Sequence, residues 1–450
     1  TYRLDDITSE PRLAGCPPGL SGVATTSTGP GFFPDNTNIA YRVVFGYKDA
    51  NDQLVLGAPS SRIVTSNTTG TSANVSVTFQ VPKEIQAAPS NFFFQVYRGH
   101  ASPDLSTEPD DEMALTYEDI CVGSPTITIT DITPDNLLGA SLYTNQGQDG
   151  ILQSNYRPPW ALDVCTFKQY AFFANTRTVM NANLTLISAG ALNGADALVP
   201  GDTITFTPNE FGGTPFTLLA VSGANNESLG WFQVSNTGNP AYDIQVTASN
   251  IALVANAYAG NEFLAAYYTS LNNELPGKLR FDRLSLIADH FTISSSRTLC
   301  WEQPITDNPT TTTLISINDE KPNRIYYSKF NQPEAVPVVN YLDVGSANAA
   351  IRRIVPLRDG VMVLKDDGVF RLSNAAPPFT ITPIDLNVRI LAANTADALD
   401  NKVYFLSDQG IVALSDSDSM IKSFVLDRTI IENTSPDLFP NLSRVAWGLA

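Results

Sequence analysis

The sequence predicts a mainly β protein, and three observations support this fold class. Charged residues make up only 16% of the 450 residues, and Ser, Thr, Asn and Gly, which weaken helix interiors, are abundant instead. Short apolar runs alternate with turn signals along most of the chain. One segment of the C-terminal third recurs after 42 residues. We therefore expect an N-terminal β-sandwich (immunoglobulin/fibronectin-like) plus a β-propeller carrying a small inserted α+β module.

The internal repeat is the most specific of these observations. Residues 361–373 match residues 403–415, with Val, Leu, Gly, Leu and Ser at equivalent positions. Each unit has a strand, a turn that ends in Gly and a second strand, and a period of about 40–45 residues is typical of a propeller blade. A further step of 42 residues reaches Val445, where 444–449 have the pattern of another strand. We therefore expect the natural polypeptide to continue and the ring of blades to be incomplete here.

Composition and pattern divide the chain into six segments. They are an irregular Pro- and Gly-rich lead-in (1–36), the sandwich (37–142), a linker (143–160), the start of the propeller (161–186), the inserted α+β module (187–296) and the propeller blades (297–450).

Within the sandwich segment, alternating apolar residues predict short strands. The first two, at 41–47 and 53–56, flank a turn rich in Asp and Asn and form the expected hairpin. A loop at 104–119 carries seven Asp and Glu and no Lys or Arg. The remaining expected strands lie at 74–81, 91–98 and 126–130.

The inserted module is expected to hold the only convincing helix. It is predicted at 247–260, with Thr247 or Ser249 as the N-cap and Gly260 just beyond the C-terminus. Its apolar face comprises Ile251, Val254, Ala255 and Tyr258. Strands are expected before the helix at 202–207 and 214–221, and after it at 263–268, 278–281 and 290–293. An apolar strand region at 167–174 precedes the whole module.

Net charge and cysteine usage exclude several classes of function. The formal charge is −18, with 27 Lys and Arg against 45 Asp and Glu, which disfavours a general nucleic-acid-binding role. No run of 18 apolar residues is present, so no membrane-spanning helix is expected. The four cysteines are not spaced as metal ligands, and they are too sparse for a disulfide framework. We therefore expect them to be buried free thiols. These cysteines are Cys16, Cys121, Cys165 and Cys300.

Motifs for catalysis are weak. The two histidines, His100 and His290, lie in different segments and lack a nucleophile elbow, so each is expected to be a surface or structural residue. Adjacent acids occur at 5–6, 110–111 and 366–367, but neighbouring side chains in a strand point apart, whereas glycosidases need opposed carboxylates. The last of these pairs fits a hairpin turn.

Two further patterns are weak matches to known sites. Residues 407–410 share Ser, Asp and Gly with the turn motif of propeller sialidases but lack its order, and 49–52 lack the glycine and glutamate of an EF-hand. We therefore predict a protein that is not an enzyme, with no catalytic, cofactor-binding or metal-ligating residues and no cofactor.

Residues 323–337 resemble a segment of a known protein family. They contain Tyr326-Tyr327-Ser328 and Pro333-Glu334 and lead into two Asp-Gly hairpins. This run resembles the propeller of the tail nozzle (tail tubular) proteins of short-tailed bacteriophages. Residues 167–177 resemble the start of that propeller, and 273–278 resemble part of the insertion that these proteins carry. The similarity covers roughly residues 160–450.

The resemblance implies a structural protein of the virion, located in the phage tail. It implies a homohexameric ring at the distal end of the tail, with portal, adaptor and tail fibre proteins as neighbours. Double-stranded DNA would pass through it transiently during genome ejection, without specific binding. Because each Lys–phosphate contact adds affinity, an acidic wall suits this passage. We hypothesise that acids such as those at 104–119 or Asp366-Asp367 line the channel.

Two other classes of function stay open. One is a receptor- or glycan-binding adhesin with a propeller, which should cluster exposed aromatic side chains on a loop face. The other is a propeller glycoside hydrolase, which needs opposed carboxylates in a central funnel.

Overall fold

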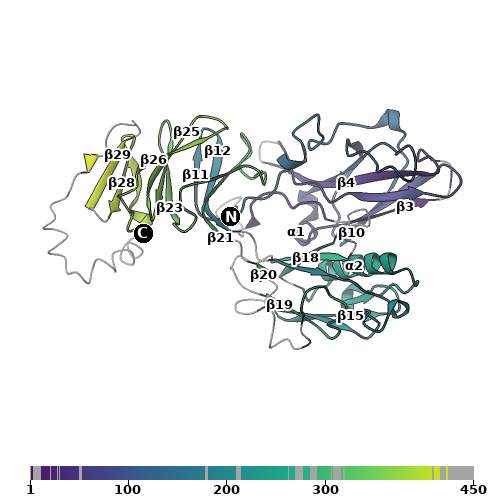
Figure 1. Ribbon diagram of the computed structural model, residues 1–450. Helices are drawn as coiled ribbons and strands as arrows, with labels where there is room; N and C mark the ends of the chain where they lie inside the picture. Colours follow the sequence, from purple (N-terminus) through teal and green to yellow (C-terminus); the bar gives the residue numbers. More distant parts are fainter. Residues whose placement is uncertain are drawn as a thin grey trace. The chain divides into compact units, whose positions relative to one another are not determined.

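The protein is mainly β, as predicted, and its strands form several antiparallel sheets (Figure 1). The computed structural model describes residues 2–3, 12–20, 22–27, 29, 31–49, 53–177, 181–208, 214–261, 263–268, 277–283, 291–305, 307, 316–317, 320–407, 410–415 and 422–423. Six single-turn 3-10 helices occur among them: η1 (Pro89–Asn91), η2 (Asp135–Leu137), η3 (Ile151–Gln153), η4 (Ala191–Asn193), η5 (Glu227–Leu229) and η6 (Ala393–Thr395). Within these ranges, no helix has the length and apolar character needed to cross a membrane.

The chain folds into two compact units. Unit 1 comprises Thr1–Gly15, Tyr156–Thr178 and Asp319–Ala450, and unit 2 comprises Cys16–Asn155 and Val179–Asn318. The inserted segment therefore packs with the N-terminal part of the chain, although its sequence neighbours on both sides belong to unit 1. It is also longer than the module expected at 187–296.

The N-terminal part of unit 2 has two antiparallel sheets that share one hydrophobic cluster, which includes Phe45, Phe79 and Phe94. The smaller sheet has the order β10 (Thr126–Asp131), β7 (Asn74–Gln80), β3 (Gly22–Ser27). The larger has the order β5 (Leu54–Leu56), β4 (Thr37–Lys48), β8 (Phe93–Arg98), β9 (Ala114–Ile120), and β6 (Ile63–Asn67) also pairs with β4. A short helix, α1 (Lys83–Ala87), follows β7.

All five strands expected here are present, and β4 and β5 form the predicted hairpin. Three other strands were not predicted. β3 lies inside the expected lead-in, because its β-branched residues pair with β7 despite the Pro and Gly around them. β6 also escaped prediction. β9 occupies the end of the expected acidic loop, since an edge strand tolerates exposed Glu and Asp.

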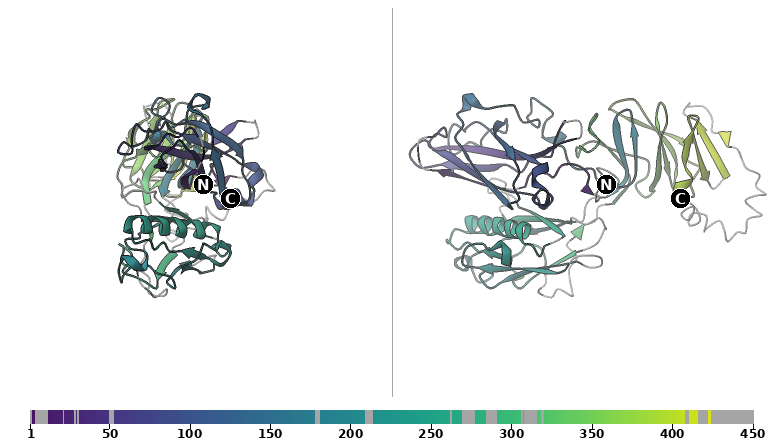
Figure 2. Two further views of the ribbon diagram at one scale, coloured as in Figure 1. Left: turned by 90° about the vertical axis from the view of Figure 1, so that its right-hand side faces the viewer. Right: turned by 180° about the vertical axis from the view of Figure 1, so that it is seen from behind.

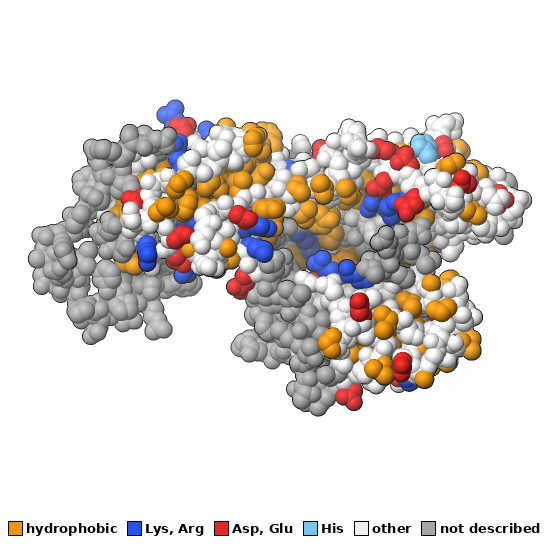
Figure 3. All heavy atoms as spheres, viewed as in Figure 1, with side chains coloured by type: hydrophobic (Ala, Val, Ile, Leu, Met, Phe, Trp, Pro, Cys, Tyr) orange, Lys and Arg blue, Asp and Glu red, His pale blue; other side chains and the backbone are white. Residues whose placement is uncertain are grey.

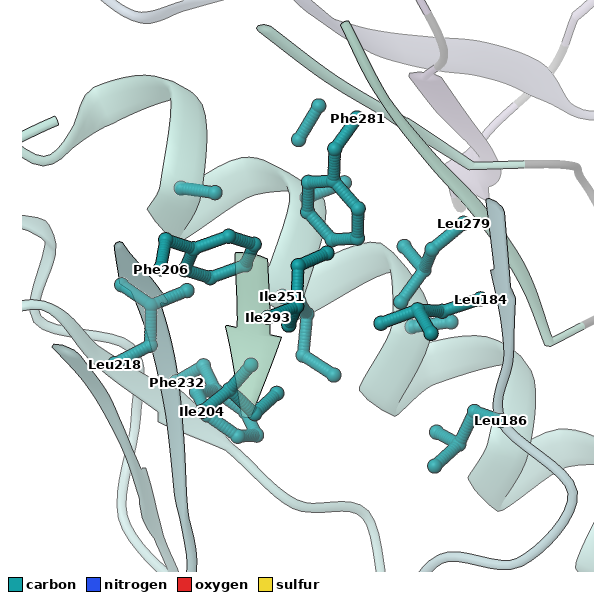
Figure 4. Close-up of a cluster of buried hydrophobic side chains, with 14 of the residues drawn as sticks. Leu184, Leu186, Ile204, Phe206, Leu218, Phe232, Ile251, Leu279, Phe281 and Ile293 are labelled. Atoms are coloured by element: carbon teal, nitrogen blue, oxygen red, sulfur yellow. The ribbon is translucent and has the colours of Figure 1, made fainter. Parts of the chain in front are cut away.

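The inserted part of unit 2 has two four-stranded sheets and the long helix α2 around one core (Figure 4). One sheet has the order β17 (Leu264–Tyr268), β18 (Lys278–Arg283), β13 (Asn181–Thr185), β20 (Ser316–Ile317). The other has the order β16 (Trp231–Gln233), β15 (Phe216–Val221), β14 (Thr203–Pro208), β19 (Phe291–Ser295), with β16 parallel to β15. Figure 4 shows Phe206, Phe281 and Ile251 converging from strands and helix on this core.

The helix differs from its prediction at both ends. α2 spans Pro240–Ala257, with Asn239 as the N-cap and Tyr258 as the C-cap. Proline is well suited to the first helical position and Asn to the cap, so Asn239-Pro240 is the true start signal. Thr247, the expected cap, is instead a buried mid-helix residue. Three residues of the predicted apolar face are confirmed as buried, Ile251, Val254 and Ala255, whereas the fourth, Tyr258, is the C-cap and packs partly buried against the same core.

Unit 1 contains three successive four-stranded antiparallel sheets, labelled in Figure 1 and seen from behind in Figure 2. The first has the order β11 (Trp160–Phe167), β12 (Tyr170–Arg177), β21 (Glu320–Tyr327), β22 (Tyr341–Asp343). The second is β23 (Ile351–Pro356), β24 (Val361–Lys365), β25 (Gly368–Ser373), β26 (Thr380–Asp385), and the third is β27 (Asp397–Leu399), β28 (Lys402–Ser407), β29 (Gly410–Ser415), β30 (Lys422–Ser423). A two-stranded pair, β1 (Tyr2–Arg3) and β2 (Arg12–Leu13), completes the unit.

The apolar strand region expected at 167–174 is interrupted by a tight turn. Lys168 and Gln169 both have positive φ, of 47° and 68°, and connect β11 to β12 as a hairpin. Two positive φ values suit the twist of paired strands but are uncommon for residues with a side chain. Because Lys168 and Gln169 occupy the positions where Gly or Asn is usual, no residue pattern predicts this turn.

Consecutive sheets of unit 1 share hydrophobic cores, and the 42-residue repeat has a structural counterpart. Val361, Val363, Phe370 and Leu372 pack with the first sheet. Their equivalents 42 residues later, Val403, Phe405, Val412 and Leu414, pack with the second sheet. The two repeats therefore lie in separate sheets, and in each repeat the same four positions face the preceding sheet.

Ion pairs tie sheets together in both units, and the pair in unit 2 is fully buried. In unit 2, Arg98 donates to Asp131 at 2.7 Å across the shared core, and both side chains are fully buried. The Tyr41 hydroxyl donates to the same carboxylate at 3.0 Å. In unit 1, Asp163 on the first sheet accepts from Arg353 at 3.0 Å and from the Ile354 backbone amide at 2.6 Å on the second.

We predict that Asp131→Asn lowers the free energy of unfolding by about 2 kcal/mol, because it removes the buried carboxylate that pairs with Arg98 and leaves only the half-exposed Asp135, 2.6 Å from Arg98, as its counter-charge. The measurement is the urea unfolding midpoint by circular dichroism. Asp366→Asn is the matched control. It breaks the exposed Arg352–Asp366 pair and should cost less than ~1 kcal/mol. Equal effects of the two variants would contradict the role given to the Arg98–Asp131 pair.

Candidate functional site

His100 is the one histidine among the described residues, and it has no catalytic arrangement. His100 is 62% exposed, and its Nδ1 lies 3.5 Å from Asp135 Oδ2. His290 lies outside the described residues. Neither the elbow nor the buried His–carboxylate contact that a hydrolase relay needs is present at His100.

The adjacent acids have structural partners. Asp366 accepts from Arg352 at 2.7 Å, and Asp367 lies 3.3 Å from the Lys365 ammonium, at the predicted turn between β24 and β25. Asp5-Asp6 lie outside the described residues. The described ranges contain no group of three or more His, Cys, Asp or Glu arranged to hold a metal ion.

The described residues of the EF-hand-like segment 49–52 and of the sialidase-like segment 407–410 have structural roles. Gln53 donates its backbone amide to Asp49 Oδ1 at 2.9 Å, and the Asp49 amide donates to the Gln53 carbonyl, so Asp49 stabilises the β4–β5 hairpin turn. In the sialidase-like segment, Ser407 is buried and pairs with Gly410, whereas Asp408 and Gln409 lie outside the described residues.

All four cysteines are free and buried, as predicted. Burial, assisted by the charge of a nearby Asp, raises the pKa of Cys121 and of Cys300 to about 12, and burial raises the pKa of Cys165 further. Thiols with such pKa values carry almost no thiolate at neutral pH, and the thiolate is the reactive form. These cysteines therefore have packing roles.

Asp243 is the most heavily hydrogen-bonded acid in the inserted part, and sequence analysis did not single it out. Its carboxylate is fully buried in the first turns of α2 and accepts bonds from Ser235, Thr237, Gly238 and Asn193 at 2.7 to 3.0 Å. Burial alone would raise the pKa of Asp243, but these bonds outweigh it and lower the pKa to about 2. The carboxylate closes the preceding loop onto the helix.

Lys365 is a buried cation in unit 1 that sequence analysis also missed. Its ammonium donates to the carbonyls of Val344 and Ser346 at 2.5 and 3.1 Å and lies over the Phe370 ring. With Asp367 also near, every partner belongs to the second sheet or to the segment that enters it. Lys365 therefore fastens that segment and is not positioned as a base or nucleophile.

The acidic loop, residues 104–112, carries most of the acids predicted at 104–119 and is exposed to solvent. Asn38 donates its side-chain amide to the carbonyls of Asp104, Leu105 and Thr107, which fixes the path of the loop. Hydrogen bonds from Ser106 and Thr107 to the Asp104 carboxylate lower its pKa. The loop is thus held in a defined shape that keeps Asp104 ionised.

Two arginines neutralise part of the acidic loop. Arg42 makes a two-oxygen contact to Asp111 at 3.1 Å, and Arg62 reaches Glu108 at 3.4 Å. All seven acids of the predicted loop, including Glu118 and Asp119 on β9, are exposed. Figure 3 shows Asp and Glu side chains distributed over this face of the N-terminal sheets. The surface therefore stays electronegative despite the two arginines.

The negative charge of the chain is concentrated in unit 2. Its segments hold 25 Asp and Glu and nine Lys and Arg, a formal charge of −16. Unit 1 holds 20 Asp and Glu and 18 Lys and Arg, a formal charge of −2. Any electrostatic repulsion of phosphate by this protein therefore originates in unit 2.

Comparisons with known proteins supply no further assignment: no family model matches the chain, and no curated protein matches it in sequence.

The Asp243 site predicts a specific dependence of stability on acid. Because the pKa of Asp243 is lower in the folded state, its contribution is complete above pH ~4 and is lost as the pH falls toward 2. Asp243→Asn should therefore destabilise the protein by roughly 1–2 kcal/mol at neutral pH and by much less near pH 2. Asp196→Asn, at an exposed acid of the same part, is the control for urea unfolding at both pH values. Equal destabilisation by Asp243→Asn at both pH values would contradict the assignment.

Proposed function

We propose that the protein is a structural subunit of a bacteriophage virion, forming the nozzle or distal tube of a short tail through which DNA leaves during genome ejection. The observation that carries the proposal is the repeated geometry of unit 1. Three four-stranded sheets follow one another, and equivalent positions 42 residues apart face the preceding sheet. Four-stranded sheets that stack face to face are the blades of a β-propeller, so this arrangement supports a propeller as the architecture of unit 1.

The segment that carries the family resemblance has a defined structural role consistent with this proposal. Ser328 exchanges hydrogen bonds with the Ala171 backbone, and the Asn331 amide donates to the Gln169 carbonyl at the β11–β12 turn. Glu334 accepts from the Gly15 amide at 3.0 Å. The Tyr-Ser and Pro-Glu positions thus extend and brace the first sheet of the proposed propeller. We infer an immunoglobulin-like sandwich for the N-terminal sheets on similar grounds of topology.

The distribution of charge supports passage of DNA without binding. Unit 2 is strongly acidic, and its acidic loop exposes carboxylates in a fixed conformation. By contrast, Asp366 and Asp367, the other acids proposed for the channel, are paired with Arg352 and Lys365. The acidic loop is therefore the better candidate for a surface that faces DNA.

The positions of the exposed aromatic side chains weigh against the alternative of a glycan-binding adhesin. Among the described residues, six aromatic side chains are substantially exposed, and they lie in different strands, helices and loops: Tyr117, Tyr156, Trp231, Tyr242, Phe330 and Tyr341. In the part of the chain that the structure describes, none of these six rings contacts another, so they do not form the aromatic platform expected of a glycan-binding adhesin.

The proposal predicts the oligomeric state. We expect light scattering and negative-stain imaging of the purified protein to give a closed ring of about six copies, since ring assembly is what a tail conduit requires. A protein that stays a monomer or a trimer at all concentrations would favour the adhesin and contradict the nozzle.

Charge reversal in the acidic loop tests its relation to DNA. Particles assembled with Glu108→Lys, Asp110→Lys and Glu112→Lys together should eject DNA roughly 10-fold more slowly, because each new phosphate contact adds affinity that passage must break. Asp397→Lys with Asp400→Lys, at exposed positions of the third sheet, is the control and should leave the rate unchanged. The measurement is the release of a DNA-bound dye over time. Unchanged kinetics in the triple variant would exclude the acidic loop from the channel.

A further inference from the structure

The N-terminal part and the inserted part of unit 2 have separate hydrophobic cores. The core of the N-terminal sheets and the core of the inserted part share no residue. Direct hydrogen bonds nevertheless join the two parts, and they involve the corner between β7 and α1 and the edge strand β3. Whether these contacts are polar or apolar determines how readily the two parts can separate.

Lys83, the first residue of α1, binds the C-terminal end of α2. Its ammonium donates to the carbonyl of Tyr258, the C-cap residue, at 3.1 Å and also to the carbonyl of Asn261. The last turn of α2 has no basic residue of its own. Because carbonyl groups at a helix C-terminus carry partial negative charge, Lys83 supplies the positive charge that the last turn of α2 lacks.

Asn256 makes the second contact, from the last turn of α2. Its side-chain amide donates to Gln80 Oε1 at 2.8 Å and to the Ala266 carbonyl at 2.7 Å, while its oxygen accepts from the Ala266 amide. Both Gln80 and Asn256 are buried. Asn256 therefore holds strand β17 to the helix and the helix to the N-terminal sheets through one planar group.

Tyr268 makes the third contact, from the end of β17. Its hydroxyl donates to the Gly22 carbonyl at 3.0 Å, and the ring is buried. Gly22 begins β3, an edge strand of the smaller N-terminal sheet. The three contacts thus join three separate elements of one part to the C-terminal half of α2 and its neighbouring strand.

We propose that these contacts form a polar latch, comprising Gly22, Gln80 and Lys83 on one side and Asn256, Tyr258, Asn261 and Tyr268 on the other, which opens without unfolding either core. Opening exposes donors and acceptors that water can satisfy, whereas opening a shared apolar core would expose hydrocarbon. Local openings of this kind require less free energy than global unfolding. The closed latch makes the inserted part a rigid extension of the N-terminal sheets, and the open latch frees it.

The latch can be tested with a distance measurement. Spin labels are placed on cysteines introduced at Ser72 in the N-terminal part and Ser222 in the inserted part, both exposed. The four native thiols are buried and do not compete for the label. We expect one narrow distance in the otherwise native protein. In Lys83→Met with Gln80→Leu, a second, separated population should rise by roughly tenfold or more, because buried partners are left unsatisfied in the closed state.

Matched variants separate the latch from general destabilisation. Lys48→Met with Gln53→Leu makes the same two chemical changes at exposed positions of the β4–β5 hairpin and should keep the narrow distance. Lys83→Arg retains a cationic donor and should also stay closed. A single narrow distance in Lys83→Met with Gln80→Leu would overturn the proposal. Loss of near-ultraviolet circular dichroism from that variant would overturn it too, because it would mean that the two parts cannot separate without unfolding.

Discussion

The burial of β24 on both faces is the constraint on which the organisation of unit 1 depends. All five residues of this strand are buried, with Val361 and Val363 packing toward the first sheet and Met362 and Leu364 toward the third. A strand with two apolar faces cannot lie at the surface of a single sheet, so a sheet must cover it on each side. The equivalent strand 42 residues later, β28, buries Val403 and Phe405 on its face toward the second sheet, so that successive sheets stack instead of merging into one.

Sequence patterns predicted features that depend on local periodicity and repetition. The hairpin of β4 and β5, the apolar face of α2 and the separate sheets of the two repeats all follow from spacing alone. The patterns failed where tertiary contacts decide the outcome. β9 is a strand because β8 lies beside it, although four of its seven residues are exposed. Asn239-Pro240 is a recognisable start signal for α2. The helix was predicted to begin seven residues later because the apolar pattern is stronger there.

Buried polar groups were the least predictable part of the molecule. Asp243, Lys365 and Asp131 each satisfy their charge through partners that are distant in sequence or lie in irregular segments. No spacing rule marks such residues, because the partners are selected by the fold. Their burial is nonetheless consistent with structural roles, since each makes several hydrogen bonds within the fold.

The uneven charge of the two units bears on how copies could assemble. The cores of protein interfaces are depleted in charged residues, and repulsion between acidic surfaces is screened beyond a distance of about 8 Å at physiological salt. Unit 1, with a formal charge of −2, is therefore better suited to close contact between copies than unit 2, with −16. In the proposed ring, contacts through unit 1 would leave the acidic units to face solvent or the DNA path. An interface built on unit 2 would instead need counter-ions or basic partners to form.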